Sequence, residues 1–191
     1  MESDAERWNA RYSASGAPEQ LQPPEVVTAH LGDLAHGAAV LDAASGWGDA
    51  GLFLAQHGAA VTFADVSSVA LLTVVDRAQA LGVHATTIAV DLSTSTVPIG
   101  PWDAIVCIHY LDRGLLPRLG DALAPGGRLV CSIATTTNLE RHERPSARFL
   151  LEPGELQTLV PDLDVIHASE AWRANGVHEA WLVATSTREP D

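Results

Sequence analysis

The architecture of this chain follows from nine consecutive residues, Val40-Leu41-Asp42-Ala43-Ala44-Ser45-Gly46-Trp47-Gly48. They predict a short apolar strand that ends on an acidic side chain, followed by a loop of small residues that leads into a helix. A buried carboxylate at the end of a strand is costly unless it meets a ligand or a hydrogen-bond donor. The small residues after it let the backbone approach a bound molecule closely. The stretch therefore predicts a binding site for a nucleotide-type cofactor.

Predicted strands and helices alternate along the chain on both sides of this stretch. The apolar runs predict strands over 39–43, 60–64, 86–90, 104–108, 128–134, 164–169 and 179–185. The amphipathic segments predict helices over 25–34, 49–57, 67–81, 115–123 and 152–160. The first four strands are almost entirely apolar, which is typical of parallel strands covered on both faces. This pattern predicts an α/β fold with a doubly wound, Rossmann-like sheet.

The last two predicted strands break this alternation because no helical segment separates them. Asn175 and Gly176 lie between an apolar run that ends near Trp172 and another centred on Trp181. Such a spacing predicts an antiparallel hairpin. We therefore expect a mostly parallel sheet closed by a C-terminal antiparallel hairpin. Residues 1–191 read as a single domain, with a flexible N-terminal arm over 1–20 and a possible lid loop over 135–151.

Two kinds of cofactor compete for the predicted site. Gly46, Gly48 and Gly51 spell the G-x-G-x-x-G pattern of dinucleotide-binding proteins, and Asp65 follows the next strand, where such a fold binds the adenosine ribose. However, the Asp42 carboxylate would repel a pyrophosphate and attract a cationic amino group. A further acid, Asp91, follows the third strand. A chain of 191 residues also leaves no room for the separate substrate domain of a dehydrogenase.

In their order and spacing, these motifs resemble those of the class I methyltransferases that use S-adenosylmethionine. The segment 42–48 resembles the first motif of that family, although Ala44 stands where many members have glycine. Asp65 corresponds to the acid that binds the ribose hydroxyls, and Asp91 with Leu92 corresponds to the pair beside the adenine. The segment 125–127, Pro-Gly-Gly, resembles the turn before the fifth strand of the family.

Two further segments resemble the thiopurine and tellurite-resistance branch of that family, which acts on small molecules. Residues 8–12 resemble its W-x-x-R-Y segment, and residues 149–156 resemble a segment near its C-terminus. Trp8 and Tyr12 are four residues apart, so they share one face of a helix. They either anchor the N-terminal arm or close over the cofactor, where aromatic rings would stabilise the positive charge of a sulfonium.

The resemblance also implies a role for each residue at the carboxyl ends of the strands. Asp42 would act on the methionine part of the cofactor, Asp65 on the ribose and Asp91 on the adenine amino group. The other residues expected at the cofactor contribute backbone contact or a covering side chain, and they are Ala44, Gly46, Trp47, Leu92 and Ile108. Because ligands bind beyond the carboxyl ends of the strands in an open α/β sheet, all of these residues should line one cleft.

Two residues after the fourth strand, His109 and Tyr110, are expected to face the methyl acceptor. His109 is the candidate general base because histidine titrates near neutral pH. The alternative is a structural histidine that is bonded to a backbone carbonyl. A base is required only if the acceptor atom carries a proton, so the acceptor atom (oxygen, nitrogen, sulfur or another chalcogen) stays open.

Composition excludes several other classes of function. A net charge of −13 disfavours nucleic acid, and no apolar run is long enough for a membrane span. The acidic N-terminus is followed by no signal-like apolar segment, which favours the cytoplasm. Cys107 and Cys131 lie in apolar runs and are expected to be reduced and buried, and no set of residues has the spacing of metal ligands. We therefore expect a small-molecule acceptor and a monomer or homodimer.

Two other functions remain open at this point. One is a NAD(P)-binding protein that uses Gly46, Gly48 and Gly51. The other is a catalytically inactive partner subunit that binds the cofactor, and Ala44 at a glycine position is its hint.

Overall fold

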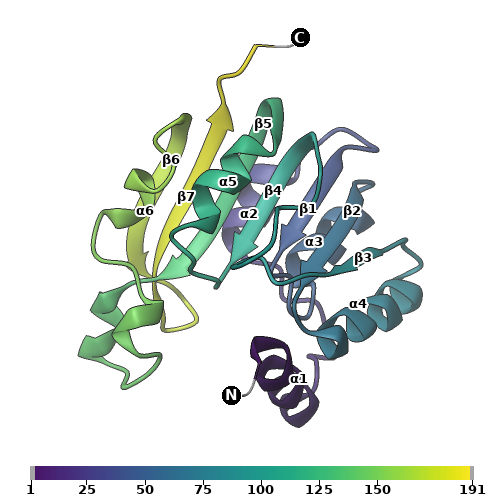
Figure 1. Ribbon diagram of the computed structural model, residues 1–191, viewed down its shortest axis with the longest axis horizontal. Helices are drawn as coiled ribbons and strands as arrows, with labels where there is room; N and C mark the ends of the chain where they lie inside the picture. The colour runs from purple at the N-terminus through teal and green to yellow at the C-terminus, as the bar shows by residue number, and fades with distance from the viewer. Residues whose placement is uncertain (1–2, 190–191) are drawn as a thin grey trace.

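The computed structural model describes residues 3–189, and a seven-stranded sheet runs through its centre with the strand order β3-β2-β1-β4-β5-β7-β6 (Figure 1). Strands β1 to β5 are parallel to their neighbours among themselves, whereas β7 runs antiparallel to both β5 and β6. The predicted mostly parallel sheet with a C-terminal hairpin is therefore confirmed. The strands are β1 (Ala39–Ala43), β2 (Ala60–Asp65), β3 (Thr86–Ala89), β4 (Trp102–Ile108), β5 (Leu123–Ala134), β6 (Leu163–Trp172) and β7 (His178–Ser186).

Helices cover both faces of this sheet, because alternate strand residues point to opposite sides. Leu41 of β1 belongs to the apolar cluster under α5 and α6, whereas Val40 belongs to the cluster under α2, α3 and α4. Figure 1 shows α5 and α6 in front of the sheet. Within residues 3–189, no helix is both long and apolar enough to cross a membrane. The helices are α1 (Asp4–Ser15), α2 (Glu25–Leu31), α3 (Asp49–Gln56), α4 (Ser68–Leu81), α5 (Leu115–Asp121) and α6 (Glu155–Thr158), with 3-10 turns η1 (Thr136–Glu140) and η2 (Ala147–Phe149).

Three predicted elements differ from the structure for identifiable reasons. The strand β3 is not covered on both faces, because it lies at the edge of the sheet and most of its residues are exposed. The helix predicted over 152–160 shrinks to α6, since Gly154 adopts φ +76° and the helix begins only after it. The strand predicted from Arg128 begins earlier, at Leu123, which pairs with Trp102 before a register shift in β4.

The N-terminal residues form a capped helix that docks on the body of the protein. Ser3 and Glu6 make a reciprocal capping box at the start of α1. The side-chain oxygen of Asn9 accepts hydrogen bonds from the Ser67 hydroxyl (2.7 Å) and from the Val69 N–H (3.3 Å), at the start of α4. Figure 1 shows α1 below the sheet, beside α4. This docking places one face of α1 next to the loop after β1, and the flexibility of residues 1–20 stays a prediction.

The hairpin and the segment 135–151 meet at the C-terminal side of the sheet. Gly176 adopts φ +80° in the turn between β6 and β7, and the Arg173 N–H donates to the Val177 carbonyl (2.8 Å). The buried side chain of Asn138 bridges the two segments, because it accepts from the His178 N–H (3.1 Å) and donates to the His178 carbonyl. The sequence signal for this turn, Asn175-Gly176, thus lies where the chain reverses.

We expect Gly51→Ala to lower the free energy of unfolding by about 1–3 kcal/mol, the usual range for overpacking a core. A methyl group on Gly51 of α3 would lie 2.4 Å from the Phe63 ring and 2.7 Å from the Asp42 carboxylate. The measurement is urea unfolding of the two proteins.

The matched control is Gly120→Ala, which makes the same change at a buried glycine of α5. There the nearest atoms would be Leu163 side-chain carbons at 3.4 Å, an ordinary contact distance. This variant should be as stable as the parent or more stable by up to about 1 kcal/mol, because alanine favours helix more than glycine does. Equal losses in both variants would contradict the proposed clash at Gly51.

Candidate cofactor site

A cleft of about 540 Å³ lies at the carboxyl ends of β1, β2, β3 and β4. Strand order reverses between β1 and β4, so this is the edge where ligands bind in open α/β sheets. The structure brings all the predicted site residues together here, and each of them lines the cleft: Trp8, Tyr12, Asp42, Ala44, Gly46, Trp47, Asp65, Asp91, Leu92, Ile108, His109 and Tyr110.

Asp42 is the most deeply buried acid of the cleft, with 2% of its surface exposed. Its carboxylate accepts one hydrogen bond from the Gly51 N–H (2.9 Å), at the start of α3. Burial raises the pKa of Asp42 well above its ordinary value, and the nearby carboxylates of Asp65 and Asp49 act in the same direction. A positively charged group in the cleft would relieve this unfavourable charge.

Asp65, at the end of β2, holds two loops with its carboxylate. One oxygen accepts from the Gly46 N–H and the other from the Ser67 N–H, both at 2.8 Å. Burial raises the pKa of Asp65, and these two hydrogen bonds oppose the shift. Since each carboxylate oxygen has two acceptor positions, each keeps one for a ligand.

Asp91, two residues beyond β3, is more exposed than the other two acids. One of its oxygens accepts from the Ser93 N–H (2.9 Å) and from the Ser93 hydroxyl (2.6 Å). The Ser93 hydrogen bonds lower the pKa of Asp91, so it is ionised at neutral pH. Hydrogen bonds from Thr94 act in the same direction.

The conformation of the loop after β1 is set by three residues with positive φ angles. Gly46 and Gly48 have φ values of +51° and +74°, and Ala44 has φ +56°. A side chain pays roughly 1–2 kcal/mol to adopt this conformation, so the loop retains some strain at Ala44. Arg77 of α4 supports the loop, because it donates to the Trp47 carbonyl and forms an ion pair with Asp49 (2.9 Å).

Three aromatic side chains close one side of the cleft. The Trp8 and Tyr12 rings of α1 stack with centroids 5.7 Å apart, which confirms that they share a helix face. Tyr12 also meets the Trp47 ring edge-on at 4.5 Å. A methyl group on Gly46 would lie 2.7 Å from the Tyr12 hydroxyl, so α1 packs directly on the loop. Burial, with the nearby Asp65 charge, raises the pKa of Tyr12 to about 12.

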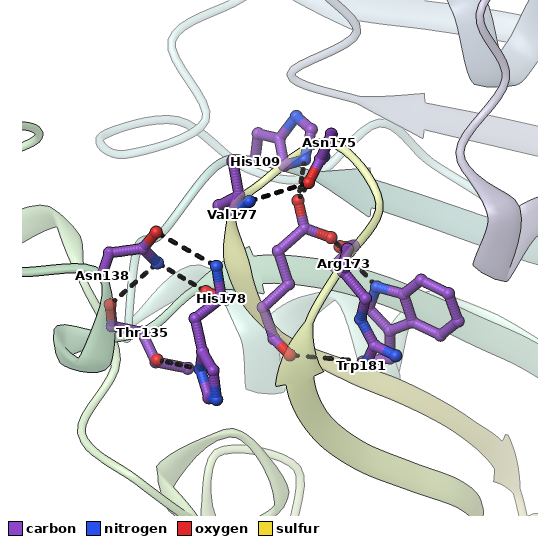
Figure 2. A network of polar contacts seen from close by, with 10 residues as sticks. His109, Thr135, Asn138, Arg173, Asn175, Val177, His178 and Trp181 are labelled. Carbon is purple, nitrogen blue, oxygen red and sulfur yellow. Dashed lines mark hydrogen bonds and ion pairs between the residues drawn. The ribbon is translucent and has the colours of Figure 1, made fainter. Parts of the chain in front are cut away.

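His109 and Tyr110 lie at the other side, beyond the end of β4. His109 has φ +57°, an uncommon conformation for a residue with a side chain, and its N–H donates to the Ser132 carbonyl (2.7 Å). Its Nε2 lies 3.0 Å from the Glu179 carboxylate, so its partner is an acid and not the backbone carbonyl of the structural alternative (Figure 2). Burial raises the pKa of Tyr110 to about 12, and the charge of Asp112 adds to this shift.

Sequence reasoning missed several residues that shape this site. Asn9 docks α1, Arg77 holds the loop and Glu179 contacts His109, each across a large separation in sequence. Arg11 and Asp49 also line the cleft. Arg11 lies within the segment 8–12 and Asp49 directly follows the segment 42–48, so their positions in the sequence indicated a place at the site. No residue of the segment 135–151 lines the cleft within the described part of the chain, and its role as a lid stays a prediction.

Comparison with known proteins agrees with this geometry. The profile of a methyltransferase domain family matches residues 40–127, which run from β1 to the turn inside β5. No curated protein matches the sequence significantly.

Solved structures show the same fold at low sequence identity. One is a protein of echinomycin biosynthesis, described for the conversion of a disulfide bond into a thioacetal group, with TM-score 0.74, 19% identity and coverage of 97% of this chain and 93% of that chain. Another is TehB from Haemophilus influenzae, with TM-score 0.72, 17% identity and coverage of 94% and 67%. A third is the magnesium protoporphyrin IX methyltransferase of Synechocystis PCC 6803, with TM-score 0.68, 20% identity and coverage of 84% and 80%.

These comparisons show that the chain has the fold of the solved structures, and that its segment 40–127 is similar to a methyltransferase domain.

We expect Asp42→Asn to raise the melting temperature, and to raise it more at pH 8 than at pH 5. The raised pKa means that folded Asp42 holds a proton more tightly than unfolded Asp42. Stability is therefore lost as pH rises from about 4, the unfolded value, towards the folded pKa. Asparagine does not titrate, and its side-chain oxygen can still accept from Gly51. Thermal unfolding at both pH values measures the effect, and a difference that does not change with pH would contradict it.

Proposed function

We propose that the protein is an S-adenosylmethionine-dependent methyltransferase that acts on a small-molecule acceptor and binds its cofactor in the cleft at the ends of β1 to β4. The observation that carries the proposal is the convergence of Asp42, Asp65 and Asp91 on that one cleft, from the ends of three neighbouring strands. When bound, S-adenosylmethionine supplies a methyl group already activated on a sulfonium, so the protein mainly has to bind, orient and exclude water.

The charges of the cleft suit a cationic ligand. Asp4, Asp42, Asp49, Asp65 and Asp91 line it, whereas Arg11 contributes the opposite charge. This acidic set favours a ligand that carries an ammonium and a sulfonium, and it disfavours the pyrophosphate of a dinucleotide. The volume of about 540 Å³ also lies in the usual range for a cofactor site.

Each of the three acids has a separate task in this proposal. Asp42 acts on the methionine end, through the backbone at Gly51 and by its charge. Asp65 accepts from the ribose hydroxyls with the acceptor positions that Gly46 and Ser67 leave free. Asp91, which is ionised and partly exposed, accepts from the adenine amino group beside the buried Leu92.

The aromatic side of the cleft and the end of β4 complete the site. Trp8, Tyr12 and Trp47 exclude water and face the positive charge of the sulfonium. His109 and Tyr110 face the acceptor, with His109 as the candidate catalytic base. A small acceptor is supported by the net charge of −13, which opposes a phosphate backbone, and by the similar fold of a methyltransferase named for magnesium protoporphyrin IX. The structure of that protein holds S-adenosylhomocysteine, which supports the cofactor.

Ligand-dependent melting separates this proposal from the dinucleotide alternative. A ligand that binds only the folded protein stabilises it by about 2.7 kcal/mol at a concentration of about 100 times its Kd. S-adenosylhomocysteine should therefore raise the melting temperature, and NADH at the same concentration should not. A shift with NADH alone would overturn the proposal.

We expect Asp65→Ala to weaken S-adenosylhomocysteine binding at least about tenfold. The substitution removes two acceptor positions for the ribose, and each hydrogen bond to a charged acceptor contributes about 1.5 kcal/mol or more. It also frees the Gly46 N–H that Asp65 holds. Isothermal titration calorimetry gives the Kd of both proteins.

The control for this titration is Asp103→Ala. Asp103 also accepts from a backbone N–H, that of Ala39 (2.8 Å), but it does so at the opposite end of β1. The net charge changes equally in both variants, so a similar loss of affinity in the control would show that Asp65 is not a specific ribose ligand.

A further inference from the structure

A buried carboxylate that does not line the cleft contacts His109. Glu179, at the start of β7, has 3% of its surface exposed and accepts four hydrogen bonds. One oxygen accepts from His109 Nε2 (3.0 Å) and Asn175 Nδ2 (3.3 Å). The other accepts from the Ser132 hydroxyl (2.7 Å) and from the indole N–H of Trp181 (3.0 Å). These bonds fix both the position and the rotation of the carboxylate.

The surroundings of Glu179 keep it ionised. Burial acts to raise its pKa, but the hydrogen bonds from His109, Ser132 and Trp181 outweigh burial and lower the pKa to about 2. Arg173 adds positive charge nearby, because its guanidinium lies 3.5 Å over the Trp181 ring and donates to the Glu179 carbonyl (3.4 Å). An ionised carboxylate only accepts hydrogen bonds, so the ring nitrogen that faces it must carry the proton.

The opposite nitrogen of the His109 ring is free. Nδ1 has no hydrogen-bond partner within residues 3–189, and 59% of the side chain is exposed. The same residue lines the cleft together with Tyr110. The ring therefore directs one nitrogen at a buried anion and leaves the lone pair of the other for a ligand.

We propose that Glu179 is a positioning residue that holds His109 as the Nε2–H tautomer and leaves Nδ1 to accept the proton of the methyl acceptor. This inference rests on the proposed function of His109. In the reaction, the acceptor atom forms a bond to the methyl carbon while the carbon–sulfur bond breaks with its electron pair on sulfur. The acceptor proton moves to Nδ1, and the resulting imidazolium faces the Glu179 carboxylate. The pair suits an acceptor whose nucleophilic atom carries an O–H or N–H proton.

The substitution Glu179→Gln tests this tautomer sharply. The indole N–H of Trp181 can only donate, and it lies closer to the carboxylate (3.0 Å) than the Asn175 amide does (3.3 Å). We therefore expect the amide oxygen of glutamine to turn towards Trp181 and Ser132. The amide NH₂ then faces His109, whose Nε2 must accept from it. The proton of the imidazole is forced to Nδ1, and the side chain that was the candidate base loses its outward lone pair.

The experiment uses the full chain labelled with ¹⁵N, and records long-range ¹H–¹⁵N spectra of the imidazoles at pH 9.5, about three units above the ordinary histidine pKa of about 6.5. The variant His109→Asn identifies the His109 signals, and asparagine tolerates the positive φ of this position. We expect the Nε2–H tautomer in the parent and the Nδ1–H tautomer in Glu179→Gln. An Nδ1–H tautomer in the parent, or no change in the variant, would overturn the proposal.

Ser132→Ala is the matched control, because it removes one hydrogen bond from the same carboxylate but leaves its charge. It should retain the Nε2–H tautomer, and an inverted tautomer would count against the proposal. If Glu179→Gln does not fold, as judged by amide dispersion, the tautomer of the parent decides alone.

S-adenosylhomocysteine titration separates the two levels of inference. Glu179 does not line the cleft, so Glu179→Gln should bind within about twofold of the parent. A parent that does not bind this probe but shows the expected tautomers would refute the proposed cofactor site and leave the positioning by Glu179 intact. Normal binding with unchanged tautomers would refute the positioning alone.

Discussion

The structure depends on one buried carboxyl group at the end of β1. Asp42 accepts a hydrogen bond from the Gly51 N–H, and this bond fixes the start of α3 against the central strand. The contact requires glycine at position 51, because Phe63 and the carboxylate itself occupy the space of a side chain. Placing an acid here destabilises the folded protein at neutral pH. A cationic ligand would be attracted by the same carboxylate. Binding residues that lower the stability of the free protein in this way are common.

The other residues of the cleft are arranged around the loop between β1 and α3. The Asp65 carboxylate accepts a hydrogen bond from the Gly46 N–H, and Arg77 donates one to the Trp47 carbonyl. The Tyr12 side chain packs on Gly46. These three supports come from β2, α4 and α1, so the loop is fixed by elements far apart in the chain. Such support pre-organises a site before its ligand arrives.

Most of the sheet and the members of the cleft could be predicted from the sequence, because both follow from local patterns. Apolar runs that end on Asp42, Asp65 and near Asp91 report strand ends, and parallel strand ends share one edge. Sequence could not reveal contacts made by tertiary pairing. Glu179 reads only as a strand residue, and its approach to His109 depends on the register that sets Ser132 opposite Trp181. Likewise, the residues around Gly154 do not indicate its left-handed conformation, which delays the start of α6 to Glu155.

The C-terminal hairpin of β6 and β7 forms one edge of the sheet, next to β5. The matched family profile ends at residue 127, before β6 and β7, yet β7 pairs with β5 and places Glu179 against His109. No residue of this hairpin lines the cleft within residues 3–189. Under the proposed roles of His109 and Glu179, substitutions on the hairpin would therefore change proton transfer and leave the cofactor contacts as they are.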